Sequence, residues 1–167
     1  MTQVRGRPDR SLRLARSRAV RLLPASGLVD DFVLAVHRDR SRPIQLLSHD
    51  LGGDSPSGMW IATESTDYVV FPADASASER TAIICHEVAH MLLGHQAEAR
   101  FDRAAQLVEM VAPNVDPTTA RRFLARHGYA EAVEADAEEL ATVLVARLAR
   151  HAEALAMRSD PVSDRLR

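Results

Sequence analysis

The sequence has no lysine, a single cysteine and few aromatic residues, and these shortages narrow the class of protein. Because Cys85 is the only cysteine, an internal disulfide is excluded, as is usual in reducing compartments. No apolar run approaches the roughly 18 residues of a membrane-spanning helix, and the N-terminus lacks the apolar segment of a secretory signal. All 21 basic residues are arginine, a bias typical of GC-rich bacterial genomes. We therefore expect a bacterial, cytoplasmic protein without membrane contact.

What the chain does contain is enough for one folded domain. Apolar residues make up 46% of the 167 residues and aromatic ones only 4%, so alanine, leucine and valine supply the interior and favour closely packed helices. The formal net charge of −2 is too small to indicate a nucleic-acid partner for the whole chain. We predict a disordered basic tail over residues 1–10, one domain over 11–158 and a flexible tail over 159–167.

Arginine residues are concentrated near the N-terminus. They are Arg5, Arg7, Arg10, Arg13, Arg16, Arg18 and Arg21. Such a cluster can contact nucleic acid or a membrane, but a solvated tail that continues into the polar face of a helix is the simpler interpretation. Direct nucleic-acid binding is therefore not expected. In this interpretation the apolar residues of the helix turn inward, namely Leu12, Leu14, Val20 and Leu22.

Hydrophobic periodicity predicts two helices followed by three strands in the first half of the chain. The helices are expected over residues 11–23 and 28–38. Short segments rich in apolar and β-branched residues follow at 43–48, 59–63 and 68–71. We predict that they form a small antiparallel sheet whose last two strands are a hairpin, and that this sheet packs on a helical bundle to give an α+β fold.

Helical periodicity returns in the second half. A helix is expected over residues 78–93, capped by a serine at 76 or 78 and ended by Gly94. Further helices are expected over 98–111, over 116–128 and, longest of all, over 131–157.

The first of these helices carries a chemical motif, His86-Glu87-Val88-Ala89-His90, which is the H-E-x-x-H pattern. Four residues of helix turn through about 400°, so the two histidines lie on one face and can share a metal ion. Glu87 is rotated by about 100°, where it can accept a proton from water on the metal. Zinc fits neutral imidazole ligands and an open position. The alternative is a pair of core histidines satisfied by ordinary hydrogen bonds, which the apolar surroundings make costly.

A third ligand is needed, and His95 is the nearest candidate in the sequence. The metzincin pattern places a glycine three residues after the second histidine and the third histidine three further on. Here Gly94 and His95 follow His90 by four and five residues, so the spacing does not match. We interpret His95 as a C-terminal helix residue favoured by the helix dipole.

The last helix offers another candidate. Two carboxylates, Glu134 and Glu138, border its apolar stripe, where a metal on the facing helix would satisfy them. Helix periodicity alone leaves ordinary rim carboxylates equally open. The stripe consists of Val133, Ala137, Leu140, Leu144 and Leu148.

These motifs together resemble the ImmA/IrrE family of bacterial metallopeptidases, which are similar to minimal gluzincins. The family carries H-E-x-x-H on one helix and E-x-x-A-(D or N)-x-(F or L)-A on a later one, and residues 134–141 read Glu-Ala-Asp-Ala-Glu-Glu-Leu-Ala. The resemblance implies a zincin-like fold, Glu134 as the third zinc ligand, and Glu138 as a residue that orients a zinc-binding histidine. Glutamate at 138 is longer than the family's Asp or Asn.

The resemblance covers residues 12–150 and includes the paired strands at 57–63 and 68–71, which are similar to those of compact actinobacterial members. Two family features are missing: no helix-turn-helix module is fused to the chain, and the usual Leu-Leu-Met-Pro ending is replaced at 142–146. What the resemblance implies is a zinc-dependent endopeptidase, with Glu87 as general base, that cuts a helix-turn-helix regulator in a stress, phage or toxin–antitoxin circuit.

From this we expect the partner to be a separate cytosolic helix-turn-helix repressor encoded nearby. We expect it to bind in extended form along a sheet edge at the 68–71 strand. The alternative is a binding protein of the same fold that does not cut, but an intact Glu87 favours the enzyme. A purely structural zinc site is disfavoured because three ligands leave a position open.

Four other residues were considered for a role in the site or the core. The hydroxyl of Tyr129 can stabilise an oxyanion, although an aromatic anchor near a turn is the commoner role. His127 is a candidate electrophile but more often a C-terminal helix residue. We expect Cys85 to be an inert buried thiol and Trp60 a core residue.

Overall fold

The computed structural model describes residues 10–50, 58–63, 65–95 and 131–159. Within these ranges the α+β class is confirmed, and the helices predicted at 11–23, 28–38, 78–93 and 131–157 are all present, with small shifts at their ends. In chain order the elements are α1 (Arg10–Leu22), α2 (Val29–Arg40), β1 (Ile44–His49), β2 (Met59–Ala62), β3 (Asp67–Pro72), α3 (Ala77–Leu93) and α6 (Glu131–Ser159).

Several predictions made from the sequence lie outside the described residues. These are the helices expected over 98–111 and 116–128 and almost all of the two tails. Within the expected tails, Arg10 and Ser159 are described, and both belong to helices.

The sheet is mixed, so the prediction of an antiparallel sheet was wrong for one of its two pairings. β2 and β3 form the expected hairpin, with Trp60 opposite Val69. β1, however, pairs parallel to β3, with Leu46 opposite Val69. The strand order is β1-β3-β2, because the chain leaves β1 and resumes at the far edge before β3 fills the centre.

This order also corrects the expected docking edge. The 68–71 segment belongs to β3, and both sides of β3 are already hydrogen-bonded to neighbouring strands. A central strand has no free ladder of backbone groups, so a peptide cannot add to it.

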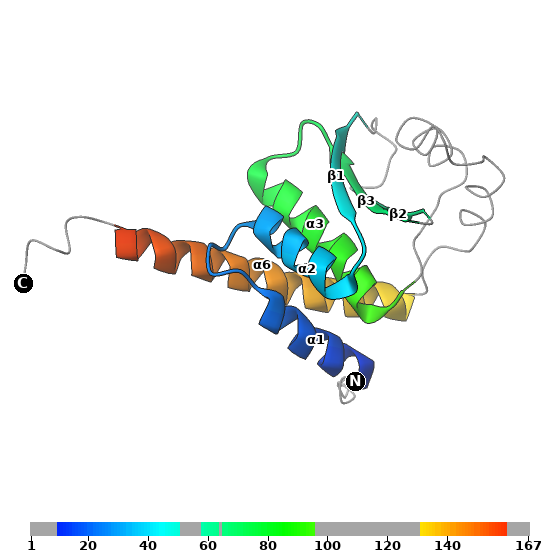
Figure 1. Ribbon diagram of the computed structural model, residues 1–167, viewed down its shortest axis with the longest axis horizontal. Helices are drawn as coiled ribbons and strands as arrows, with labels where there is room; N and C mark the ends of the chain where they lie inside the picture. The colour runs from blue at the N-terminus through cyan, green and yellow to red at the C-terminus, as the bar shows by residue number, and fades with distance from the viewer. Residues whose placement is uncertain (1–9, 51–57, 64, 96–130, 160–167) are drawn as a thin grey trace, which may run out of the picture.

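Helix α3 lies at the centre of the molecule. It packs against β3, α1, α2 and α6, and Figure 1 shows the sheet on one side of it and α6 on another. The core around it includes Phe32, Val69, Ile84, Leu140 and Leu144, each at most 1% exposed. Burying side chains of this size stabilises a fold by about 1.5–3 kcal/mol each, so α3 is held from several sides.

Both ends of α3 are capped. Ser76 accepts a hydrogen bond from the Glu79 amide, and the Glu79 carboxylate accepts one from the Ser76 amide, so Ser76 is the cap of the two serines considered. Gly94 ends the helix in the left-handed conformation, with φ of 76°. A serine cap of this kind contributes about 1 kcal/mol.

The inward face of helix α1 agrees only in part with the expected one, since Leu12 is buried and Leu22 packs against the core. Leu14 is 62% exposed, whereas Ala15 and Ala19 are buried beside Leu12. The small alanines allow α1 to approach α3 and α6 closely, and this sets the buried face. Two arginines of the exposed face form intramolecular pairs, Arg16 with Glu139 at 3.9 Å and Arg18 with Asp39 at 2.6 Å, as a solvated polar face would.

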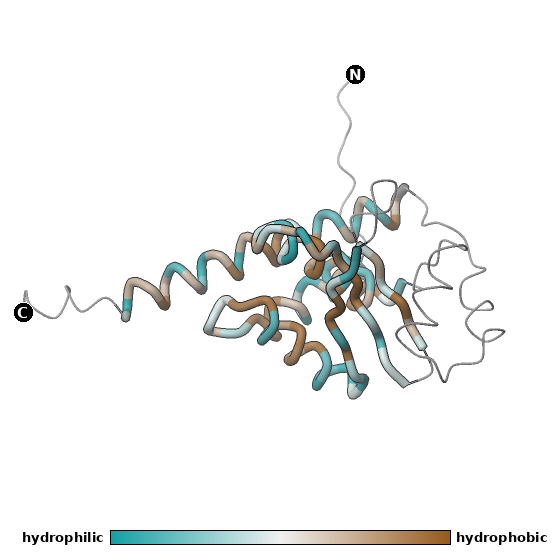
Figure 2. The backbone as a smooth tube through the Cα atoms, turned by 90° about the horizontal axis from the view of Figure 1, so that it is seen from above, coloured by the Kyte–Doolittle hydropathy of each residue, from teal (hydrophilic) through white to brown (hydrophobic). Residues whose placement is uncertain are grey.

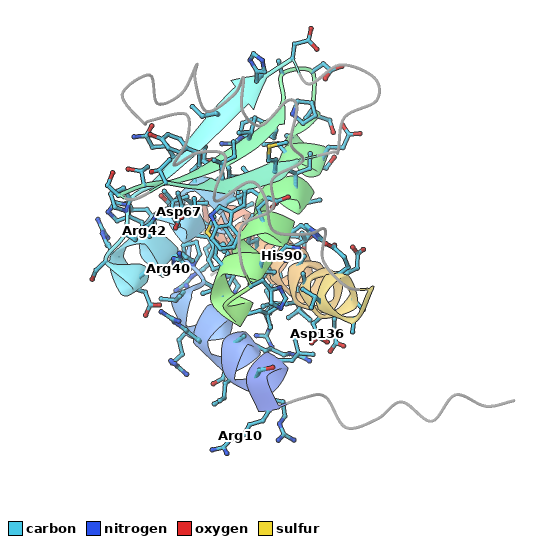
Figure 3. The ribbon with its side chains drawn as sticks, turned by 90° about the vertical axis from the view of Figure 1, so that its right-hand side faces the viewer. Arg10, Arg40, Arg42, Asp67, His90 and Asp136 are labelled. Carbon is cyan, nitrogen blue, oxygen red and sulfur yellow. The ribbon has the colours of Figure 1, made fainter. Side chains whose placement is uncertain are left out.

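A cluster of polar groups joins the sheet to the end of α3. Asp67, fully buried at the start of β3, accepts hydrogen bonds from Arg40 at 2.7 Å and Trp60 Nε1 at 3.1 Å and pairs with Arg42 at 3.0 Å. Figure 3 shows the two arginines beside it. Arg40 also donates to the Met91 carbonyl at 3.0 Å, in the last turn of α3. Trp60 is 5% exposed, which confirms it as a core residue.

Helix α6 carries the expected apolar stripe. Ala137, Leu140, Leu144 and Leu148 are buried, while Val133 is only partly so. The C-terminal end of α6 projects beyond the other elements and alternates hydrophilic and hydrophobic residues (Figures 1 and 2). None of the helices in the described ranges is long and apolar enough to cross a lipid bilayer.

Candidate metal centre

Three side chains predicted as metal ligands converge between α3 and α6. The Nε2 atoms of His86 and His90 are 3.0 Å apart. The Glu134 carboxylate spans both rings, with one oxygen 3.4 Å from His86 Nε2 and the other 3.8 Å from His90 Nε2. Helical spacing on α3 supplies the two imidazoles, and the close packing of α6 brings the carboxylate to them.

The spacing of these donor atoms suits a tetrahedral metal ion. Zinc bonds of about 2.0–2.2 Å at tetrahedral angles require donors separated by roughly 3.3–3.6 Å. The two imidazole nitrogens are 3.0 Å apart, and each lies 3.4 or 3.8 Å from a different Glu134 oxygen, close to that range. Two imidazoles and one carboxylate are also a donor set that zinc accepts, and they leave a fourth position for water or substrate. The residues present therefore fit the ion.

Burial keeps His90 in the form that a ligand requires. Its side chain is 1% exposed, and burial together with the neighbouring His86 and His95 lowers its pKa to about 3. The ring is therefore neutral at physiological pH, the charge state that a metal-binding histidine requires.

Glu87 lies beside the three ligand residues but is not one of them. It is 9% exposed and lines the same cavity as His86. The backbone of Gly58, just before β2, approaches it closely: a Cβ placed on Gly58 would lie 3.5 Å from Glu87 Oε1. The Glu87 carboxylate thus lies between its own helix α3 and the backbone that leads into the edge strand β2.

The other nitrogen of each histidine also faces a side chain. His86 Nδ1 is 3.9 Å from the Glu138 carboxylate, which is 77% exposed; this is an ion-pair distance rather than a hydrogen bond. His90 Nδ1 is 2.9 Å from His95 Nδ1, well within hydrogen-bond distance. His86 Nδ1 therefore has the Glu138 carboxylate nearby without a hydrogen bond, whereas His90 Nδ1 has a hydrogen-bond partner in His95.

The contact made by His95 was missed by the sequence analysis, which interpreted this residue only through the helix dipole. Gly94 turns the chain into the left-handed region, and the His95 amide then donates to the His90 carbonyl at 3.0 Å. This turn folds the His95 ring back against His90. Burial lowers the pKa of His95, an effect that Asp136 on the facing helix opposes (Figure 3). The sequence feature that could have predicted this contact is Gly94, because a glycine at the end of a helix allows the chain to turn back.

Among the remaining candidates, Cys85 lies within the described residues. Cys85 is fully buried, as expected, and burial raises the pKa of its thiol to about 12, so little thiolate forms at neutral pH. Tyr129 and His127 lie outside the described residues. His151 Nδ1 bonds the Pro24 carbonyl at 2.8 Å and so joins α6 to the loop between α1 and α2.

The arrangement as a whole can hold a divalent cation with a free coordination position, next to an enclosed carboxylate and an open cavity. Comparisons of the chain with protein-family models, with curated proteins and with solved structures gave no match in any of the three. The functional assignment therefore depends on the geometry and chemistry of the site.

Proposed function

We propose that the chain is a zinc-dependent endopeptidase of the ImmA/IrrE type with a zincin-like fold. The observation that carries the proposal is the convergence of His86, His90 and Glu134, with donor separations of 3.0–3.8 Å, beside Glu87. A structural zinc site uses four protein ligands, whereas a catalytic one keeps a position open. Hydrolysis also requires a general base that can accept a proton from water, and Glu87 is the candidate for that role.

In the proposed mechanism His86, His90 and Glu134 hold the ion, which supplies Lewis acidity toward water and the substrate carbonyl. Glu87 accepts a proton from the attacking water and then delivers it to the leaving amine nitrogen. The Glu87 side chain is 9% exposed and so is largely shielded from bulk water. With Nε2 of His90 on the ion, the ring proton would lie on Nδ1, and His95 Nδ1, 2.9 Å away, would accept a hydrogen bond from it.

We propose that the substrate adds as an extended strand to β2. Among the described residues no strand pairs with the outer edge of β2, and β2 begins next to Gly58, whose backbone approaches Glu87. A peptide on this edge would pass close to the metal centre with its backbone already hydrogen-bonded. Strand addition requires a flexible segment in the target, so rigid folded proteins should be cut poorly.

The family resemblance supports a cytosolic helix-turn-helix regulator, encoded nearby, as the substrate. The first test is metal analysis of the purified protein beside His90→Ala. Wild type should hold about one zinc per chain and the variant little. Equal zinc in both would rule the site out.

The second test is co-expression with the neighbouring regulator, using Glu87→Gln as the control, with the regulator followed by mass spectrometry. Glu87→Gln should keep zinc and the fold but lose cleavage by at least about 100-fold. A regulator that is bound equally with or without Glu87, and never cut, would favour the non-cleaving binding protein instead.

A further inference from the structure

Arg40, the last residue of α2, joins the buried carboxylate of Asp67 to the end of helix α3. One of its terminal nitrogens donates to Asp67 Oδ2 at 2.7 Å, and the other donates to the Met91 carbonyl at 3.0 Å. Met91 directly follows the candidate ligand His90 in the last turn of α3. One planar guanidinium therefore connects a fixed point of the sheet to the backbone beside a metal ligand.

The guanidinium of Arg40 is itself held on several sides. The side chain is 18% exposed, and its Cζ lies 5.9 Å from the centroid of the Trp60 ring. Asp67 is fully buried, and its carboxylate also accepts a hydrogen bond from Trp60 Nε1 at 3.1 Å and pairs with Arg42 at 3.0 Å. Because both the guanidinium and its counter-charge have little freedom to move, the contact with the Met91 carbonyl restrains that carbonyl in space.

The last turn of any helix has carbonyls without partners inside the helix. In α3 the His90 carbonyl accepts from the His95 amide at 3.0 Å, and the Met91 carbonyl accepts from the Gly94 amide at 3.3 Å as well as from Arg40. The two amides belong to the turn itself and move with it. Of these three donors, only Arg40 belongs to another element, so it ties the turn to the rest of the protein.

We propose that Arg40 is a positioning residue of the metal centre, which holds the last turn of α3 so that the His90 ring faces His86 and Glu134. The proposal rests on the proposed function and names a residue outside the H-E-x-x-H motif on which metal binding depends. The Nε2 atoms of the two histidines are 3.0 Å apart and come from successive turns, so a small rotation of the last turn would change the donor spacing. A lysine at position 40 keeps a positive charge, but one ammonium group does not reproduce the planar fork of arginine.

The variant Arg40→Lys and the matched control Arg80→Lys separate positioning from general stabilisation. Arg80 also joins α2 to α3: it donates to the two carboxylate oxygens of Asp30 at 2.7 and 2.9 Å, and its Cζ lies 5.2 Å from the centroid of the Phe71 ring. It lies near the start of α3, whereas His90 lies in the last turn. Each variant loses one arginine fork, so urea unfolding should show a loss of stability in both.

Competition for zinc against a chelator and the visible absorption of the cobalt(II)-loaded protein report on the metal centre itself. Arg40→Lys should weaken zinc binding by about 10-fold and change the cobalt absorption, because both depend on the geometry of the ligands. Arg80→Lys should keep zinc affinity within about twofold of wild type, with an unchanged cobalt spectrum. Arg40→Gln, whose single amide nitrogen is shorter in reach than the arginine fork, serves if Arg40→Lys does not fold.

Wild-type zinc affinity and an unchanged cobalt spectrum in the folded Arg40 variant would overturn the positioning role. An equal loss of zinc affinity in Arg40→Lys and Arg80→Lys would also overturn it, because general destabilisation has that effect. Failure of the proposed function is a different result. A wild-type protein that binds neither zinc nor cobalt has no metal centre for Arg40 to position, and both proposals then fall. One zinc per chain in wild type and an unaffected Arg40→Lys would leave the metal centre standing and remove only the role of Arg40.

Discussion

The hydrogen bond between His90 and His95 predicts a loss of zinc affinity in a His95→Ala variant. The two Nδ1 atoms are 2.9 Å apart, and His90 is 1% exposed. If Nε2 of His90 binds zinc, its Nδ1 must carry the ring proton and can donate it to His95 Nδ1. Burial lowers the pKa of His95, which favours the neutral ring that such an acceptor requires. Removing such an orienting acceptor weakens metal binding by about 10–100-fold, or about 1.4–2.8 kcal/mol.

The assay is competition for zinc against a chelator of known affinity at pH 7.5. His95→Asn is the informative control, because the asparagine Oδ1 occupies the position of the lost Nδ1 and can accept the same hydrogen bond. It should recover affinity to within about threefold of wild type. His151→Ala removes a histidine whose contact is with the Pro24 carbonyl, and it should leave zinc affinity unchanged.

Two results would refute this reasoning about His95. One is a His95→Ala variant that binds zinc as wild type does. The other is an equal loss in His95→Ala and His95→Asn while both remain folded, since the effect would then come from the ring rather than from the acceptor at that position.

The other predictions concern the ligand assignment and the packing around it. Glu134→Ala should weaken zinc binding more than 100-fold, as expected for loss of a direct ligand, whereas Glu138→Gln should weaken it by at most about 10–100-fold. Competition against a chelator measures both variants, and a larger loss in Glu138→Gln would show that the roles of the two glutamates must be exchanged. Gly58→Ala should lower the free energy of unfolding by about 1–3 kcal/mol, because its Cβ would overlap the Ile83 Cγ2 methyl, and unchanged urea unfolding would contradict this. Asp67→Asn should cost about 3 kcal/mol in the same urea assay, because Arg40 and Arg42 lose their buried counter-charge, and a cost below about 1 kcal/mol would show that the cluster contributes little.

The features that the sequence predicted well are those fixed by nearby residues. The start of α3 at Ser76 and its end at Gly94 follow from short-range capping chemistry, and the buried stripe of α6 follows from helical periodicity. His86 and His90 lie on the same face of α3 for a similarly local reason, because helix geometry alone places residues four apart on one face.

The order of the strands could not be obtained in this way. Alternation and β-branched residues identify β1, β2 and β3 one at a time, but they do not specify which strand lies between the other two. The sequence predicted an antiparallel sheet with a hairpin of its last two strands, and the 68–71 segment was expected to lie at a sheet edge. In the folded chain β3 has partners on both sides and β2 forms the edge near Glu87, so the expected route of the substrate moves to β2.

Residues outside any motif control how the motif is held. Asp67 looks like a turn carboxylate in the sequence, because nothing local reveals that Arg40, Arg42 and Trp60 will surround it from three other segments. Once buried, it fixes Arg40, which in turn bonds the Met91 carbonyl, one residue beyond His90. His95 contacts the same end of α3, because its amide donates to the His90 carbonyl after the turn at Gly94. The position of His90 is therefore set by the last turn of α3 as a whole, and the H-E-x-x-H spacing supplies only the face on which the ring lies.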